Sequence, residues 1–162
     1  MTPILKVILI RKSRKGSDYH SAAVLLPPVK TDEKWKMIGI SDEIVKEIPQ
    51  SPLRGSVYAI HDTKIPVRYQ VKVREFLEAQ IGKKRRKSHW YLRYLRNVAS
   101  IQIGRKKNNC WDSAELVMAA LHKSGCFKLF SAQEPFEMTP NYLAKSPNLY
   151  FRGTVKTKEE IV

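Results

Sequence analysis

Cys110 stands where the sequence predicts the start of a helix, and this position could make its thiol reactive. Residues 108–125, N-N-C-W-D-S-A-E-L-V-M-A-A-L-H-K-S-G, have a polar start at Asn108 or Asn109, an apolar body and a glycine end. A thiol in the first turn of a helix meets unpaired N–H groups and the positive end of the dipole, which favour the thiolate. The cations at 105–107 act in the same direction. The alternative is a small buried hydrophobic residue, the commonest role of a free cysteine.

A thiolate nucleophile needs a general base, and the chain offers four histidines. His20 begins a predicted strand and would therefore lie at the rim of a sheet, and His61 ends another predicted strand. His89 stands in a basic stretch that solvent could cover. His122 lies about three helical turns from Cys110, or ~18 Å, which is too far for contact. We therefore expect His20 to be the partner of Cys110.

Three segments carry a resemblance to a known family. Residues 19–25, Y-H-S-A-A-V-L, resemble the histidine strand of the circularly permuted NlpC/P60 group of papain-like cysteine hydrolases, and residues 109–117, N-C-W-D-S-A-E-L-V, resemble its nucleophile helix. Residues 138–147, M-T-P-N-Y-L-A-K-S-P, are similar to the T-P-x-x-L-x-x-S-P segment that often follows. The resemblance spans most of the chain. It implies a thiol hydrolase or acyltransferase that uses Cys110 as nucleophile and His20 as general base, without a cofactor, on a peptide, amide or acyl-lipid substrate.

The same resemblance implies a third polar residue, on the strand after the histidine, which orients the imidazole. Segments 21–26 and 35–40 are predicted to form a hairpin. Pairing residue 26 with residue 35 puts Ser41 opposite His20, whereas a slip of one residue puts Asp42 there. Asp42 is the chemically better orienting group, and the register stays open at this point.

The elements that must position these residues indicate a small α+β domain. Short apolar runs, with partial alternation at 34–40, predict strands at 4–10, 20–26, 34–40, 56–61, 67–73 and 149–155. Helices are predicted at the end of 73–81, at 108–125 and after Thr139, which precedes a proline. We expect an antiparallel sheet packed against a central helix, and the resemblance extends this to a permuted papain-like fold. Residues 1–155 would form one domain, with a charged tail at 156–162.

The charge of the chain supports a second interpretation. The 162 residues carry a net charge of +15, and ten of the basic residues lie in 83–107, a stretch without Asp or Glu that is predicted to be a basic helical insert. Lysine and arginine side chains neutralise phosphates, and neighbouring aromatic rings stack on bases. The candidate nucleic-acid-binding residues are Lys83, Lys84, Arg85, Arg86 and Lys87. The alternative function is therefore a basic nucleic-acid-binding protein or a virion- or ribosome-like structural protein, including an inactive form of the same fold.

Several classes of protein are disfavoured by the sequence. No apolar run approaches the roughly 20 residues of a transmembrane helix. The first residues lack the basic leader of a signal peptide, so we expect a cytoplasmic or virion-associated protein in which Cys110 and Cys126 stay reduced. The scattered histidines, without a C-x-x-C pair, give no metal-ligand spacing. The seven glycines lie too far apart for a phosphate-binding loop.

Overall fold

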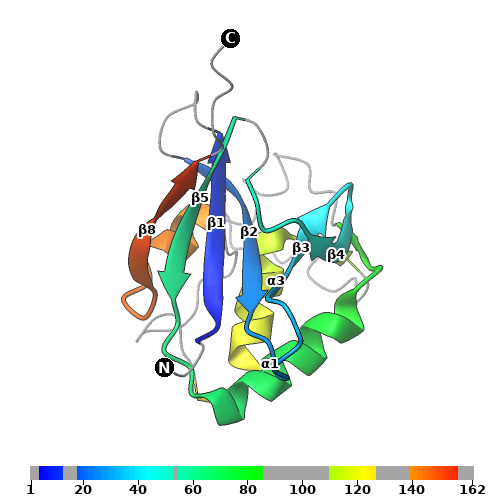
Figure 1. The fold of residues 1–162 in the computed structure, drawn as a ribbon. Coiled ribbons are helices and arrows are strands. Elements are labelled where there is room, and N and C mark those ends of the chain that lie inside the picture. Colours follow the sequence, from blue (N-terminus) through cyan, green and yellow to red (C-terminus); the bar gives the residue numbers. More distant parts are fainter. Residues whose placement is uncertain (1–3, 13–17, 53–54, 86–109, 127–138, 157–162) are drawn as a thin grey trace, which may run out of the picture.

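The computed structural model describes residues 4–12, 18–52, 55–85, 110–126 and 139–156, which form a mixed α+β fold (Figure 1). An eight-stranded sheet has the order β7-β6-β4-β3-β2-β1-β5-β8, and all its pairings are antiparallel except that of β6 with β7. The elements along the chain are β1 (Lys6–Lys12), β2 (Tyr19–Leu26), β3 (Lys36–Ser41), β4 (Ile44–Ile48), β5 (Ser56–Asp62), α1 (Val67–Gln80), β6 (Lys84–Arg85), β7 (Cys110–Trp111), α3 (Ser113–His122), α4 (Pro140–Ala144) and β8 (Tyr150–Lys156). The expected α+β class with an antiparallel sheet is confirmed.

Alternation along the two central strands divides their side chains between two apolar clusters. On β1, Val7 and Leu9 point to the face that the helices cover, whereas Ile8 and Ile10 point to the opposite face. The same division holds along β2. Both faces of the sheet are thus apolar at its centre, which explains why β1 reads as a nearly continuous apolar run rather than as a clean alternation.

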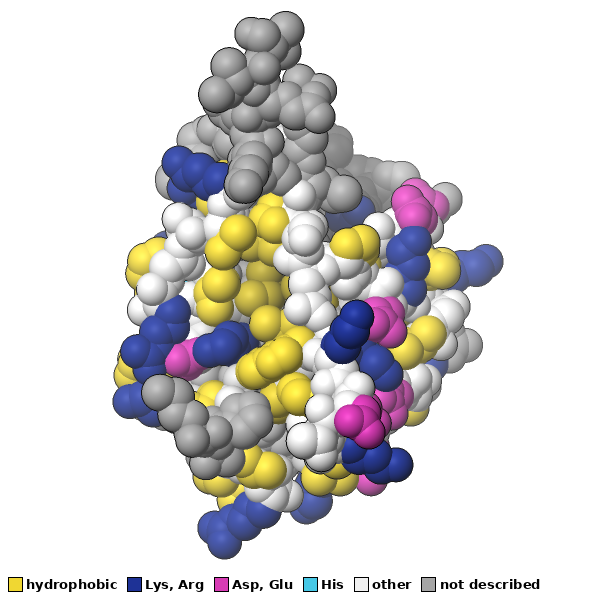
Figure 2. All heavy atoms as spheres, viewed as in Figure 1, with side chains coloured by type: hydrophobic (Ala, Val, Ile, Leu, Met, Phe, Trp, Pro, Cys, Tyr) yellow, Lys and Arg dark blue, Asp and Glu magenta, His cyan; other side chains and the backbone are white. Residues whose placement is uncertain are grey.

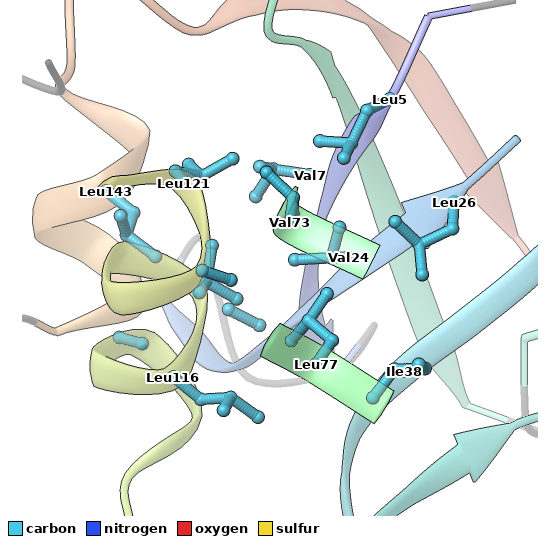
Figure 3. Close-up of a cluster of buried hydrophobic side chains, with 14 of the residues drawn as sticks. Leu5, Val7, Val24, Leu26, Ile38, Val73, Leu77, Leu116, Leu121 and Leu143 are labelled. Atoms are coloured by element: carbon cyan, nitrogen blue, oxygen red, sulfur yellow. The ribbon is translucent and has the colours of Figure 1, made fainter. Parts of the chain in front are cut away.

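The larger cluster lies between the sheet and the helices. Figure 3 shows leucines of α3 and α4 pointing into the same cluster as Val73 and Leu77 of α1 and Val24 of β2. The side chains of Leu116, Leu121 and Leu143 are fully buried or nearly so. Burial of a leucine contributes about 1.5–3 kcal/mol, so this contact fixes α3 against β2. In Figure 1, α3 lies behind the sheet, beside β2 and β3.

The smaller cluster lies on the opposite face of the sheet, which is the front face in Figure 2. Apolar side chains gather there along the middle of the sheet, with charged side chains on both sides. Its buried members are Ile8, Ile10, Ala23, Met37, Ile48 and Tyr58.

Residues 67–73 were predicted to be a strand, and this prediction is wrong. They form the first half of α1, whose buried residues are Gln70, Val73, Leu77 and Gln80. These residues recur every three or four positions, which is the period of a helix face. The three valines at 67, 71 and 73 favour a strand locally, but packing of this face against α3 determines the outcome.

The other predicted strands and the short helix after Thr139 are confirmed, and three strands, β4, β6 and β7, were not predicted. Strands β1, β2, β3, β5 and β8 lie where they were expected, and Thr139 caps α4 by accepting a hydrogen bond from the Tyr142 N–H at 3.1 Å. The missed strand β4 follows a two-residue turn, Asp42–Glu43, with φ of 51° and 65°. Positive φ at both residues is typical of a tight hairpin. The predicted basic helical insert begins not as a helix but as the short strand β6, and its residues beyond Arg85 lie outside the described residues.

Candidate active site

A pocket of about 710 Å³ opens near the start of β2, where β2 and β3 separate. The pairing of the two strands ends at Ala23 and Gly39, so the preceding residues of β2 diverge from the end of β3. The lining comes from seven elements and the loops beside them: Ile10, Lys12, Asp18, Tyr19, His20, Ser21, Ile40, Ser41, Ile48, Pro49, Ser56, Tyr58, Arg85 and Ser113. The pocket therefore joins the rim of the sheet to the first residue of α3.

His20 lines this pocket from an irregular position in β2. Ile10 pairs with Ser21, but the next residue of β1, Arg11, pairs with Tyr19, so His20 is the extra residue of a β-bulge. A bulge redirects side chains and is frequent beside active sites. The expectation that His20 stands at the rim of the sheet is confirmed.

The surroundings of His20 keep its imidazole neutral. Partial burial lowers its pKa from the ordinary 6.5, and the positive charges of Lys12 and Arg85 lower it further. A neutral imidazole near pH 7 has a free lone pair and can accept a proton from a nucleophile. The electrostatic setting of His20 is therefore that of a base rather than of a charged anchor.

Two hydrogen bonds hold the start of β2 against the helices. The Ala22 N–H donates to the Ser113 hydroxyl at 3.2 Å, and the Tyr19 N–H donates to the Asn141 side-chain oxygen at 2.8 Å. Both N–H groups lie in the part of β2 that has no pairing with β3. Tyr19, just before His20, is thus attached to α4, and Ala22, two residues after it, is attached to α3.

Cys110 does not lie in the first turn of α3, so that prediction is wrong. The helix begins at Ser113, its N-cap is Asp112, and the Leu116 N–H donates to the Asp112 carbonyl at 2.9 Å. Neither Asn108 nor Asn109 is the cap. The backbone of Cys110 instead belongs to β7, where it pairs in parallel with Lys84 of β6. This pairing holds the backbone of Cys110 in an extended conformation, two residues before Asp112, whose carbonyl accepts the first helical hydrogen bond.

The backbone of Cys110 nevertheless lies between residues that belong to the pocket. Ser113 follows it by three residues, a separation of at most about 11 Å in an extended chain, and Ser113 lines the pocket. Arg85 also lines the pocket, and its backbone pairs with Trp111, the neighbour of Cys110. The fold therefore places the start of α3, the bulge at His20 and strand β7 in one region.

Asp42, the predicted orienting residue, is bound to a different group. Leu26 pairs with Lys36, which is the register that would put Asp42 opposite His20 if the ladder continued. The ladder stops before that point, and Asp42 begins the β3–β4 turn, where its carboxylate pairs with Lys46. The other candidate, Ser41, lines the pocket together with His20.

The remaining histidines lie in other environments. His61 is buried in β5 with its ring edge against Phe151, at 5.5 Å between ring centroids, and burial lowers its pKa. His122 is exposed at the C-terminal end of α3, and His89 lies outside the described residues. Among the three described histidines, His20 is the one that lines the pocket.

The basic cluster contributes one pocket residue that sequence reasoning assigned to another role. Lys84 and Arg85 are exposed on β6, Lys83 donates to the Gln80 side-chain oxygen at 2.7 Å, and Arg86 and Lys87 lie outside the described residues. Arg85 was predicted to bind nucleic acid, but it also lines the pocket together with His20. Lys12, the second cation of the pocket, was not predicted to have a role.

Other kinds of site find no support in the described part of the chain. No group of three or more His, Cys, Asp and Glu residues there is arranged to hold a metal ion. None of the helices in these residues has the length and apolarity needed to span a bilayer. Cys126 is an exposed free thiol, 3.6 Å from the Ser124 hydroxyl.

Comparison with known proteins adds no relative. No protein family, curated protein or solved structure matches the chain. The functional argument therefore depends on the pocket and on the residues around it.

Proposed function

We propose that the chain is a thiol hydrolase or acyltransferase of the permuted NlpC/P60 type, with Cys110 as nucleophile and His20 as general base. One observation carries the proposal: the pocket that His20 lines also includes Ser113, the first residue of the helix that follows Cys110. The order of histidine strand before cysteine segment, and the packing of α3 on β2, support a permuted papain-like arrangement.

The chemistry would be acyl transfer. His20 takes the thiol proton, and the sulfur of Cys110 attacks the carbonyl carbon of an amide or ester. The C–N or C–O bond then breaks, and the leaving group takes the proton back from His20. Water, or an alcohol or amine acceptor, gives a proton to His20 and attacks the thioester; the C–S bond breaks, the acyl group leaves on the acceptor, and the sulfur takes the proton back from His20. A backbone N–H at the start of α3 would stabilise the oxyanion in both steps.

The orienting role falls to Ser41 rather than to Asp42 in this proposal. Ser41 shares the pocket with His20, whereas the Asp42 carboxylate is paired with Lys46. A neutral hydroxyl positions an imidazole without stabilising its charged form as strongly as a carboxylate does. We therefore expect a slower enzyme than one with an aspartate in that place.

Thiol reactivity tests the proposal without a known substrate. Iodoacetamide at neutral pH should alkylate Cys110 about tenfold faster than the exposed Cys126, as followed by peptide mass spectrometry, because only a thiolate reacts. His20→Gln should slow alkylation of Cys110 to the rate of Cys126. His122→Gln, at an exposed histidine of α3, is the matched control and should change nothing. Equal, slow labelling of both cysteines in the unaltered protein would refute the dyad.

A second candidate function is nucleic-acid binding, which the net charge of +15 and the exposure of Lys84 and Arg85 favour. Binding of a single-stranded oligonucleotide should weaken steeply with salt if phosphates are neutralised. The double variant Lys84→Gln/Arg85→Gln should flatten this dependence, whereas Lys30→Gln/Lys34→Gln, which removes two charges from a loop, should not. An affinity that changes neither with salt concentration nor in Lys84→Gln/Arg85→Gln would eliminate this function.

A further inference from the structure

Two cations stand on the wall of the pocket beside His20. Lys12 ends β1 and Arg85 ends β6, so they reach the pocket from strands that are not neighbours in the sheet. Among the described lining residues, Asp18 is the one acidic side chain that accompanies them. The charged side chains of the lining therefore have a net positive charge, and they lie around the imidazole of His20, the proposed general base.

The charges of Lys12 and Arg85 are not neutralised within the described part of the chain, where neither forms an ion pair. Other cations there do form such pairs, namely Lys6, Lys36, Lys46, Arg74 and Arg152. The field of the two pocket cations also extends to the imidazole, because both contribute to the low pKa of His20. Two such charges beside a partly enclosed space attract an anion into it.

One side of the pocket is apolar. Ile10, Ile48 and Tyr58 belong to the smaller apolar cluster, on the face of the sheet opposite α3, and all three line the pocket. Figure 2 shows this face with apolar side chains gathered along its middle. A ligand that satisfied the whole pocket would carry one anionic group and one apolar part.

We propose that Lys12 and Arg85 determine specificity, by selecting acyl substrates that carry an anionic group, a carboxylate or a phosphate, next to an apolar chain. The proposal rests on the proposed function, because it assigns a substrate class to the same site. Arginine binds planar oxyanions through two parallel hydrogen bonds, and lysine adds a point charge. The apolar part of the substrate would lie against Ile10 and Tyr58.

A pair of alkylating reagents that differ mainly in charge tests this directly. Iodoacetate is anionic and iodoacetamide is neutral, so the ratio of their rates at Cys110 measures attraction of the anion and cancels changes in thiolate fraction. The ratio should be higher at Cys110 than at Cys126. Lys12→Gln and Arg85→Gln should each lower it about two- to fivefold, the range of a charge contact near solvent, and added salt should lower it too. The matched control Lys30→Gln/Lys72→Gln removes two exposed charges outside the pocket and should leave it unchanged.

Chromogenic esters extend the test to turnover. We expect kcat/KM for the p-nitrophenyl half-ester of succinate to exceed that for its methyl ester, and Lys12→Gln/Arg85→Gln should abolish the difference. Protection of Cys110 from iodoacetamide by butyrate, compared with phenyl phosphate, distinguishes a carboxylate from a phosphate as the preferred anion. Protection by either one supports the proposal, and protection by neither overturns it.

The outcomes separate this inference from the function on which it rests. If Cys110 is alkylated rapidly and His20→Gln slows this reaction, but the ratio of the iodoacetate rate to the iodoacetamide rate is the same in Lys12→Gln and Arg85→Gln, the substrate class is wrong and the dyad stands. If Cys110 reacts no faster than Cys126, the proposed function fails first. If a single-stranded oligonucleotide protects Cys110 while the small anions do not, the cations serve nucleic acid, and the inference is overturned.

Discussion

The hydroxyl of Ser113 accepts a hydrogen bond from the Ala22 N–H at 3.2 Å, which joins the first residue of α3 to β2 two residues after His20. Helix and strand meet there at a point where β2 has no pairing with β3. The hydrogen bond thus takes the place of a sheet contact, and it sets the position of the helix start relative to the imidazole.

Ser113→Ala should destabilise the fold and loosen the site together. The Ala22 N–H would lose its partner, which costs about 1–3 kcal/mol where water does not replace it. Urea unfolding measures this loss, and alkylation of Cys110 should slow in the same variant. Ser41→Ala, on another wall of the same pocket, should leave the free energy of unfolding within about 0.5 kcal/mol. If Ser41→Ala destabilises the protein as much as Ser113→Ala does, the loss in Ser113→Ala is not specific to the hydrogen bond with the Ala22 N–H.

His20 should titrate below the ordinary histidine value. Burial first, and then Lys12 and Arg85, lower its pKa from 6.5, so proton binding is weaker in the folded state than in the unfolded state. Its contribution to the free energy of unfolding therefore falls as the pH drops through about 6.5, where the unfolded chain binds the proton first. Proton NMR of the imidazole measures the pKa.

Removal of either cation should move that titration upward. Lys12→Gln and Arg85→Gln each take away one cause of the low pKa, whereas Lys72→Gln on α1 leaves the pocket unchanged and should not shift it. A pKa at or above the ordinary value in the unaltered protein would contradict the placement of His20 in the pocket.

The sequence predicted most of the strands because their apolar residues mark buried positions, as on β1 and β2. It failed at residues 67–73, since β-branched valines favour a strand locally while the spacing of Gln70, Val73 and Leu77 suits a helix face. Two buried positions of α1 are glutamines, Gln70 and Gln80, which an apolar pattern does not mark as buried. The packing of α1 against α3 is not expressed in any local pattern either. Strand β4 was missed because Asp42 and Glu43 form a tight turn without glycine.

The sequence predicted only those features of the site that depend on the position of a single residue within its own element. His20 at a strand start was found, but the bulge that turns it depends on the pairing of Arg11 with Tyr19. The N-cap moved from Asn109 to Asp112 because the parallel pairing of Cys110 with Lys84 links segments 26 residues apart. The approach of Arg85 to His20 likewise needs the whole order of the sheet. Long-range pairing decides each of these points.

Gly39 should not tolerate a methyl group. A Cβ added there would lie 2.9 Å from the Cβ of Ala23 and 3.2 Å from the Ile48 side chain, so the strands β2 and β3 would have to move apart. We expect Gly39→Ala to lower the free energy of unfolding by about 1–3 kcal/mol, the usual cost of overpacking. Thermal or urea unfolding measures it.

A compensating variant separates this clash from a loss of backbone freedom. Ala23→Gly removes the nearer methyl group, so Ala23→Gly/Gly39→Ala should recover part of the stability lost in Gly39→Ala. The pocket begins where this pair ends the β2–β3 ladder, and alkylation of Cys110 should recover in parallel. If the double variant loses as much stability as Ala23→Gly and Gly39→Ala lose in total, the contact between residues 23 and 39 is not the cause.

Asp62 should be important for stability through its two cations. Its carboxylate is buried and accepts hydrogen bonds from Lys6 of β1 and Arg152 of β8, so it links both neighbours of β5. Burial raises its pKa, but the hydrogen bonds and charges of Lys6 and Arg152 outweigh this and bring the pKa below the ordinary 3.8. Because the pKa of Asp62 is lower in the folded state, its stabilisation is complete above the pKa of the unfolded state and is lost as the pH falls through the pKa of the folded state.

We expect Asp62→Asn to cost about 1–3 kcal/mol at neutral pH and to remove part of the acid dependence of urea unfolding. Asp42→Asn, at the exposed pair with Lys46, should cost less than about 1 kcal/mol, and equal losses in the two variants would show that burial of Asp62 adds nothing.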